Sequence, residues 1–218
     1  MKAELSRSYI SVRRDGCPSY GGSQNWFGGM LRVCGCGVIG AADILWYLEH
    51  DDEMTLEEYD RYVRRLRRSF VMIPFRGIPG FMMAFCLDLC MRRRGLPYRV
   101  RWGAGRGGIR KTAAAMIRDD IPVPFCIGAC LHQLRNKPLC RGLRLCRKAG
   151  EPGAEQYIWT KTVRNHFMVM TGIEGKWARI SSWGQEYYID LEELEKLSKG
   201  DMRGIFTNMI RIRRIREK

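Results

Sequence analysis

Two residues of this chain have the types and the surroundings of a nucleophile and its base. Cys36 stands between two glycines and opens a stretch, residues 38–48, in which apolar side chains recur at helical spacing. A cysteine at a helix N-terminus meets the positive end of the helix dipole and free N–H groups, which stabilise a thiolate. The same N–H groups can bind an oxyanion. The sequence therefore predicts a reactive thiol at Cys36, whereas the nearby Cys34 is interpreted as an incidental loop cysteine.

His166 is the candidate base. It stands on a predicted strand with apolar neighbours, and histidine can take a proton from a thiol and pass it to a leaving group. It follows Cys36 by 130 residues, an order and separation typical of one class of cysteine enzymes. A single cysteine or histidine is more often a packed core residue. Order, separation and helix start together favour a catalytic pair.

Three runs of the sequence resemble a known family. Residues 35–48, GCGVIGAADILWYL, resemble the active-site helix of papain-like cysteine peptidases, especially the group similar to bacteriocin-leader-processing peptidases. Residues 165–184, NHFMVMTGIEGKWARISSWG, are similar to their histidine strand with the next turn and strand, and residues 121–124 resemble the strand before it. The resemblance implies a papain-like fold and an acyl-transfer site, in which Cys36 attacks an amide and His166 shuttles the proton.

The resemblance also implies a polar residue that orients the imidazole and a glutamine that binds the oxyanion. The family usually has asparagine or aspartate one strand after the histidine, where this chain has Ser181 and Ser182. A serine accepts a hydrogen bond from the imidazole without adding a charge, and the nearest carboxylate, Asp190, lies beyond the turn. The family glutamine often precedes the cysteine at the place that Met30 holds here, so Gln24 is the candidate.

Three functions remain open at this level. The first is a thiol-dependent hydrolase or acyltransferase, most simply a cysteine peptidase with a peptide or protein substrate in a cleft. The second is a catalytically degenerate relative that binds a partner without cleaving it, suggested by the serines at the orienting position. The third is a nucleic-acid-associated protein, suggested by charge alone.

Much of the net charge of +15 lies in short clusters of arginine, at 64–65, 67–68, 92–94 and 211–216. A positive field attracts nucleic acid, anionic membranes or acidic proteins without reading a sequence. None of the clusters is part of an aromatic nucleic-acid motif. A well-solvated surface is the simplest interpretation, with an acidic partner or substrate as the alternative.

The order of the predicted elements favours an α+β fold, with N-terminal helices packed on a C-terminal, mostly antiparallel sheet. A single domain is expected over 1–218, in which residues 1–97 form the loop and helical part and residues 98–218 the sheet part. Residues 1–33 and 132–153 are expected to be irregular, and 121–127 to be an edge or first strand because of its prolines. Helices are expected near 36–48, 55–66, 79–93, 109–118 and 191–197, and strands at 98–102, 157–162, 165–171, 177–182, 186–189 and from 205 onward.

Composition excludes several other classes. Nine cysteines, an odd number, in a chain long enough to fold without disulfides suit a reducing compartment, and the first residues lack the apolar core of a secretory signal, so a cytoplasmic protein is expected. No stretch is long enough to span a membrane. Cys86/Cys90 and Cys126/Cys130 lack zinc-knuckle spacing, so no metal is expected. The glycines at 103, 105 and 108 fit GxGxxG, but no carboxylate follows the next strand, so no dinucleotide or other cofactor is expected.

Overall fold

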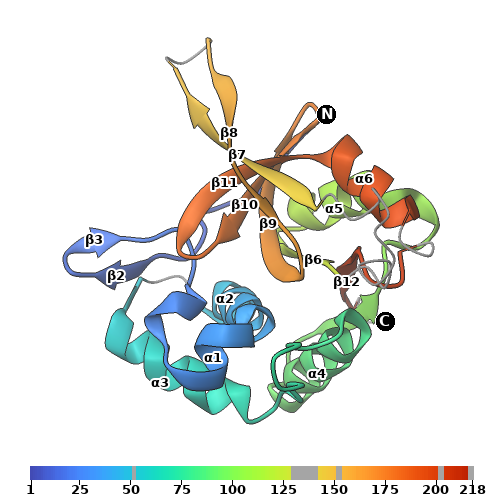
Figure 1. Ribbon diagram of the computed structural model, residues 1–218. Coiled ribbons are helices and arrows are strands. Elements are labelled where there is room, and N and C mark those ends of the chain that lie inside the picture. Colours follow the sequence, from blue (N-terminus) through green and yellow to red (C-terminus); the bar gives the residue numbers. More distant parts are fainter. Residues whose placement is uncertain (51–52, 129–141, 151–153, 201–203, 216–218) are drawn as a thin grey trace.

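An antiparallel sheet of nine strands carries the architecture, and helices pack against both of its faces (Figure 1). The computed structural model describes residues 1–50, 53–128, 142–150, 154–200 and 204–215. The strands are β1 (Lys2–Glu4), β2 (Val12–Arg14), β3 (Cys17–Pro18), β4 (Met54–Thr55), β5 (Tyr98–Trp102), β6 (Val123–Ile127), β7 (Leu143–Ala149), β8 (Gln156–Val163), β9 (His166–Glu174), β10 (Trp177–Ser182), β11 (Gln185–Asp190) and β12 (Asn208–Arg214). The helices are η1 (Gln24–Trp26), α1 (Gly29–Cys34), α2 (Cys36–Glu49), α3 (Leu56–Arg67), α4 (Gly80–Arg93), η2 (Gly105–Gly107), α5 (Gly108–Arg118) and α6 (Leu191–Gly200). The α+β class predicted from the sequence is confirmed.

The strands follow one another across the large sheet in the order β5-β12-β6-β9-β10-β11-β7-β8, and β1 pairs with β9 beyond the end of β6. Tight turns join β9 to β10 and β10 to β11, as their short connections predicted. A smaller sheet, β3-β2-β4, lies near the N-terminal helices. Both hairpins therefore bring β9, β10 and the turn after β10 to the middle of the molecule.

The α2 helix lies directly on β9 because its contact face is made of small residues. A Cβ at Gly37 would come within 2.6 Å of Ile78 and 3.3 Å of Phe167, and one at Gly40 would lie 3.4 Å from Val169. Close approach of helix and strand therefore depends on glycine at 37. It brings the first residue of α2 next to the first residues of β9.

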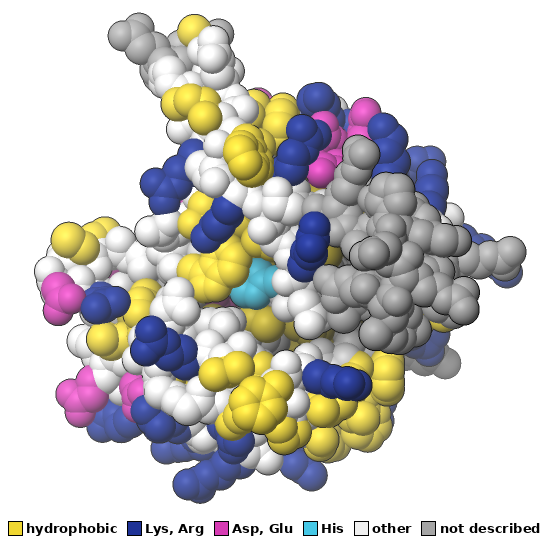
Figure 2. Space-filling view, in the orientation of Figure 1, with side chains coloured by type: hydrophobic (Ala, Val, Ile, Leu, Met, Phe, Trp, Pro, Cys, Tyr) yellow, Lys and Arg dark blue, Asp and Glu magenta, His cyan; other side chains and the backbone are white. Residues whose placement is uncertain are grey.

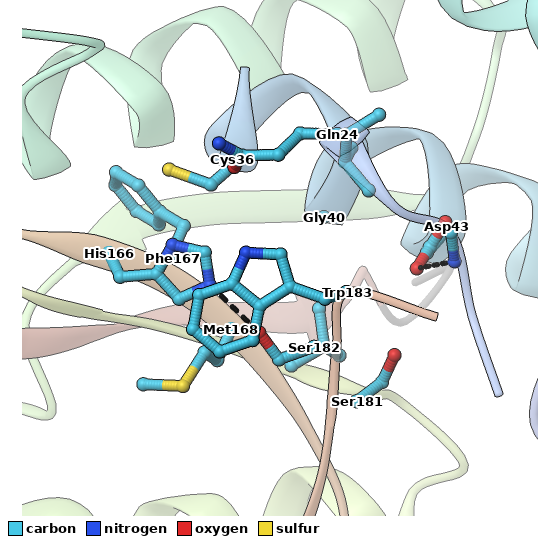
Figure 3. A pocket seen from close by; sticks show the side chains of 13 residues that line it. Gln24, Cys36, Gly40, Asp43, His166, Phe167, Met168, Ser181, Ser182 and Trp183 are labelled. Atoms are coloured by element: carbon cyan, nitrogen blue, oxygen red, sulfur yellow. Dashed lines mark hydrogen bonds between the residues drawn. The ribbon is translucent and has the colours of Figure 1, made fainter. Parts of the chain in front are cut away.

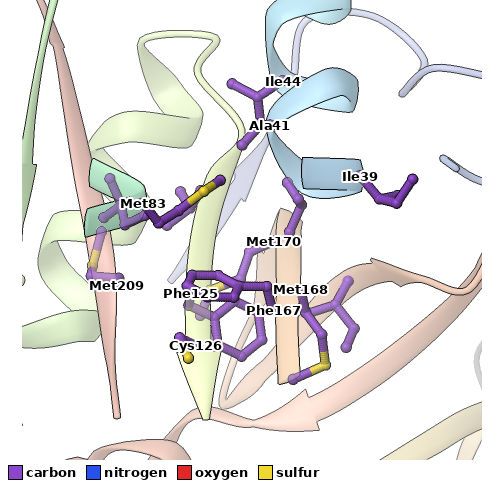
Figure 4. Packing of buried hydrophobic residues seen from close by; sticks show 14 of the residues in the cluster. Ile39, Ala41, Ile44, Met83, Phe125, Cys126, Phe167, Met168, Met170 and Met209 are labelled. Carbon is purple, nitrogen blue, oxygen red and sulfur yellow. The ribbon is translucent and has the colours of Figure 1, made fainter. Parts of the chain in front are cut away.

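The hydrophobic core fills the space between the helices and the sheet. Met83 of α4 and Phe125 and Phe167 of the sheet are buried in it, together with Ile44 of α2, and Figure 4 shows these side chains in one cluster. Burying side chains of this size contributes about 1.5–3 kcal/mol each to folding. The core therefore holds α2, and with it Cys36, firmly against β6 and β9.

Several predicted boundaries are confirmed. Thr55 caps α3 with the reciprocal hydrogen bonds to Glu58 that a capping box requires. α2 begins at Cys36, α4 ends just before Gly95, and β5 and β10 span the predicted residues. Among the described residues, no helix has both the length and the apolar character needed to cross a membrane.

Three structural predictions are wrong. Residues 1–33 contain β1, β2, β3, η1 and α1. β1 and β2 pair with the distant strands β9 and β4, which local sequence does not reveal, and η1 and α1 are only 3 and 6 residues long. β6 is an inner strand between β12 and β9; it tolerates Pro124 because β12 pairs only with Phe125 and Cys126. Residues 143–149, expected to be irregular, form β7 opposite β8, while 132–141 and 151–153 lie outside the described residues.

Candidate active site

Cys36 and His166 line the same small pocket, whose cavity volume is about 20 Å³. Figure 3 shows it from close by, and Figure 2 shows the surrounding face as a hollow with a histidine at its centre and hydrophobic and basic side chains around it. The lining residues come from the N-terminal loop, α2, β9, β10 and the turn after β10: Gly22, Gln24, Cys36, Ile39, Gly40, Asp43, His166, Phe167, Met168, Val169, Ser181, Ser182 and Trp183. The structure thus brings all five residues predicted for the site into one place.

Cys36 is held at the start of α2 by a sharp break between two helices. α1 ends at Cys34, and Gly35 separates it from α2, where a Cβ would lie 2.3 Å from the Leu31 carbonyl oxygen. Burial raises the pKa of the Cys36 thiol above its ordinary value. Backbone N–H groups of Phe167, Gly37 and Cys36 itself act in the opposite direction by hydrogen bonding to the sulfur. These donors are the ones that would stabilise a thiolate formed during reaction.

His166 is the first residue of β9 and is almost fully buried, with 7% of its surface exposed. Its Nε2 lies 2.8 Å from the Ser182 hydroxyl oxygen, and the other ring nitrogen points toward Cys36 in Figure 3. Burial, and after it the nearby positive charge of Lys161, lower the pKa of His166 to about 3. The imidazole is therefore neutral at physiological pH. With its proton on Nε2, it presents the Nδ1 lone pair toward the thiol.

Trp183 covers the imidazole. Its ring stacks on His166 at a centroid distance of 4.1 Å and an interplanar angle of 11°, and Lys161 Nζ lies 3.6 Å from the Trp183 centroid on a cation–π contact. Trp183 and Gly184 have φ values of 51° and 72°, the backbone of a two-residue hairpin turn with both central residues left-handed. Unlike glycine, Trp183 carries a Cβ that makes this left-handed backbone conformation unfavourable. Its strained backbone, next to the candidate base, is typical of a functional position.

The two candidate serines have different roles. Ser182 contacts the imidazole, whereas Ser181 Oγ donates a hydrogen bond of 2.8 Å to the Tyr20 carbonyl. Gln24 reaches the pocket from η1, and Figure 3 shows its amide beside Cys36. Its Nε2 donates to the Arg32 carbonyl at 2.8 Å, while its Oε1 is buried without a hydrogen-bond partner among the described residues. Buried polar atoms are normally hydrogen-bonded, so this oxygen can accept from a water or from a ligand that enters the pocket.

A chain of hydrogen bonds joins the N-terminal loop to the β10–β11 turn. The Tyr20 N–H donates to the Gly184 carbonyl at 3.0 Å, and the Gly184 N–H donates to the Gly22 carbonyl at 2.9 Å. The Gly22 N–H in turn donates to Asp43 Oδ2 at 2.9 Å. Three segments far apart in the sequence are therefore fixed to one another. Their positions determine where Gln24 and Ser182 lie relative to Cys36.

Asp43 is a site residue that the sequence analysis missed. It is buried on α2, accepts a hydrogen bond of 2.5 Å from the Tyr59 hydroxyl, and has its pKa raised to about 7, chiefly by burial. The signal was present, because Asp43 is the only charged residue in 36–48 and lies two helical turns after Cys36 on the same face. Trp183 and Lys161 were also missed; nothing in the local sequence marks their contact with His166.

The remaining candidates lie elsewhere. Cys34 is buried, and its thiol donates to the Met30 carbonyl oxygen; His50 follows the end of α2 and stacks on Trp46. Asp190 pairs with Lys176 at the start of α6, and His132 lies outside the described residues. No group of three or more metal-ligating side chains gathers in the part of the chain that the structure describes. Comparisons with models of known families, with curated proteins and with solved structures find no match.

Proposed function

We propose that the protein is a thiol-dependent acyl-transfer enzyme, a cysteine peptidase-like hydrolase with a papain-like arrangement of its site. One observation carries the proposal: Cys36 at the start of α2 shares a pocket with His166, and Ser182 holds the imidazole by Nε2 at 2.8 Å. Nucleophile, base and orienting group stand in the order that nucleophilic catalysis requires. The pair lies in a hollow rather than in the interior of the core.

The chemistry would run through a neutral pair. As Cys36 Sγ attacks the carbonyl carbon of an amide, its proton moves to Nδ1 of His166, and the resulting imidazolium donates it to the leaving nitrogen. The C–N bond breaks, leaving an acyl thioester on Cys36. Water, or another nucleophile in an acyltransferase, then attacks the thioester with His166 as base. Ser182 keeps the ring in the orientation that both steps need.

The oxyanion would be held by the start of α2 together with Gln24. The Cys36 N–H belongs to the first turn of the helix, where the amide groups have no intrahelical acceptor. The Gln24 side chain has a second amide hydrogen besides the one that it gives to Arg32. Its unpaired Oε1 suits an N–H of the substrate. These features favour an extended peptide, which offers a carbonyl and an N–H on each residue.

The redox state of the described cysteines is consistent with a thiol enzyme. None of the seven described cysteines is in a disulfide, and Cys36 needs a reduced environment to act as a nucleophile. We therefore place the protein in a reducing compartment, the cytoplasm. Its positive charge favours acidic segments in a peptide or protein substrate.

The pH dependence of Cys36 alkylation by iodoacetamide, followed by mass spectrometry, tests the proposal. A thiol and imidazole that share one proton react at a rate independent of pH between their two apparent pKa values. Cys17, which is exposed, supplies a comparison thiol in the same molecule, because the alkylation rate of a thiol outside such a pair rises about tenfold per pH unit while the thiol is mostly protonated. His166→Ala should abolish the plateau, whereas His50→Ala should leave it unchanged.

A binding protein without catalysis is the second candidate, and one observation favours it. Ser182 supplies no charge to stabilise an imidazolium, and burial disfavours both the thiolate and the imidazolium at rest. In that case Cys36 would follow the pH dependence of Cys17, and His166→Ala would have no effect. This outcome would rule out the enzyme and leave a peptide-binding cleft.

A further inference from the structure

The edge of the large sheet carries four arginines in a square. β5 and β12 pair in antiparallel register, with Arg101 opposite Arg211 and Arg99 opposite Arg213. Paired residues project from the same face, and alternate residues along a strand do so too. Arg99, Arg101, Arg211 and Arg213, here called the arginine block, therefore share one face. Only the half on β12 stands out as a cluster in the sequence, because 110 residues separate Arg101 from Arg211.

The arginine block faces away from α4, which packs beside the candidate active site. Trp102 and Ile210 form the adjacent pair of the ladder and project from the opposite face. The Trp102 ring lies against α4, since a Cβ at Gly80 would come within 2.2 Å of it. The cleft and the arginine block are thus separate surfaces. A partner can occupy one without blocking the other.

The charges of the block are not compensated within the described residues. No described carboxylate forms an ion pair with any of the four, whereas Arg92 pairs with Asp88 at 2.6 Å. The pKa of Arg211 is lowered by partial burial and then by the positive charges of Arg213 and Arg101. Like charges opposite each other on a ladder repel and destabilise the sheet. An anion bound across the block would remove that repulsion.

A glycine-rich loop extends the basic surface. The Arg211 guanidinium lies over Gly105, where a Cβ would come within 2.7 Å of it, and Gly105 has φ of 71°. Only glycine leaves both the space and the backbone conformation for this contact. The exposed Arg106 follows at once. The glycines of the rejected GxGxxG motif thus have a structural use: they let the loop lie against the arginine block.

We propose that the arginine block binds the phosphate backbone of a single-stranded nucleic acid. Guanidinium groups bind phosphate oxygens in bidentate fashion, and strand geometry repeats them about every 6.7 Å along the sheet, so one strand can meet several in succession. Val100 and Ile212, which lie between the arginines along the two strands, are buried. Ile215, exposed and two residues after Arg213, offers too little apolar surface by itself for insertion into a membrane. The large exposed hydrophobic residues Phe81 and Phe85 belong to α4, on the other face.

Fluorescence anisotropy of a labelled 20-nucleotide single-stranded DNA, titrated with the whole protein from 50 to 200 mM salt, tests this proposal. Four phosphate contacts predict a slope of log K against log salt of about −3, because each contributes about −0.7. Arg101→Gln/Arg213→Gln should halve the slope and weaken binding about tenfold or more at 100 mM salt. Arg65→Gln/Arg68→Gln removes the same charge from exposed positions on and after α3 and should keep the slope.

Equal weakening by the two double variants would overturn the proposal in favour of a diffuse positive field, and so would the absence of binding at 50 mM salt. A membrane or an acidic protein would be the partner instead if phosphatidylserine vesicles or polyglutamate, but not the oligonucleotide, bound in a block-dependent way. The Cys36 alkylation plateau should be unchanged in both variants. A failure of this proposal is thereby distinguished from a failure of the proposed enzyme.

Discussion

The cleft and the arginine block lie on the same sheet, but ionisable groups are neutral in the cleft and charged in the block. In the cleft, His166 and Asp43 are buried and Cys36 is partly buried, and burial shifts the pKa of each group toward the neutral form. In the arginine block, three of the four side chains are exposed and Arg211 is half-buried, and guanidinium groups stay charged even where they repel one another. The first region suits proton transfer between neutral groups over short distances. The second suits long-range attraction of anions.

The two regions also differ in how they are assembled. The cleft joins α2, β9, β10 and the N-terminal loop through hydrogen bonds between residues far apart in sequence, such as Gly22 to Asp43 and Tyr20 to Gly184. The arginine block needs only the register of two strands. Substitutions in the cleft should therefore affect geometry and rate together. Substitutions in the block should change affinity and salt dependence with little structural effect.

Loss of the nucleophile should have the largest effect. Cys36→Ala should abolish cleavage of a pooled peptide library read by mass spectrometry, and His166→Ala should slow it by about 10²–10⁴-fold, the usual contribution of a general base. Cys34→Ala is the matched control, because Cys34 is buried away from the pocket and only bonds to the Met30 carbonyl. Cleavage that survives in Cys36→Ala, or is lost equally in Cys34→Ala, would place the chemistry elsewhere.

Substitutions of the two neighbouring serines should distinguish orientation of the His166 imidazole from support of the surrounding backbone. Ser182→Ala leaves the buried Nε2 of His166 without its partner, at a cost of about 1–3 kcal/mol, and should lower the Cys36 alkylation plateau about tenfold. Ser182→Asn should retain much of the rate, since its amide oxygen can accept from Nε2. Ser181→Ala removes only the bond to Tyr20. Equal effects of the two alanine variants on the plateau would argue against an orienting role for Ser182.

The sequence predicts the catalytic-type residues of this cleft better than it predicts the contacts that position them. Cys36 at a helix start and His166 on a strand follow from local periodicity, and the strands that flank the turn follow from alternation. The contact of Ser182 rather than Ser181 with the imidazole depends on the hairpin register, where a shift of one residue reverses the face. The stacking of Trp183 and the arginine block depend on strand pairing across the whole sheet, which no local pattern encodes.

Stability against pH should show two buried groups acting in opposite directions. The pKa of Asp43 is raised in the folded state to about 7, so its contribution to the unfolding free energy decreases as pH rises from 4 to 7. The pKa of His166 is lowered to about 3, so its contribution is complete above pH 6.5 and is lost as pH falls toward 3. Each group changes stability by up to about 1.4 kcal/mol per pH unit, and between pH 4 and 6.5 the two largely cancel.

Single variants should reveal how the unfolding free energy depends on pH through each group alone, measured by urea unfolding at pH 4, 5 and 6. Asp43→Asn does not titrate; its single amide oxygen can still accept from the Gly22 N–H, while its amide nitrogen can donate to the Tyr59 hydroxyl. This variant should therefore lose stability on acidification through His166. His166→Gln should gain stability on acidification through Asp43. Curves parallel to that of the wild type for both variants would show that neither group has the shifted pKa.

The smallest effect is expected in the arginine block. Arg101→Ser removes repulsion from Arg211 opposite it, so the unfolding free energy should increase by about 0.2–1 kcal/mol at low salt, and the gain should disappear at about 1 M salt, where the Debye length is about 3 Å. Arg92→Ser, which breaks the pair with Asp88, should instead decrease stability. Ser182→Ala should be indifferent to salt because its effect is confined to buried, neutral groups. A gain for Arg101→Ser that persists at high salt would mean that packing, not charge, limits the stability of this edge, and the block would lose its basis as an anion site.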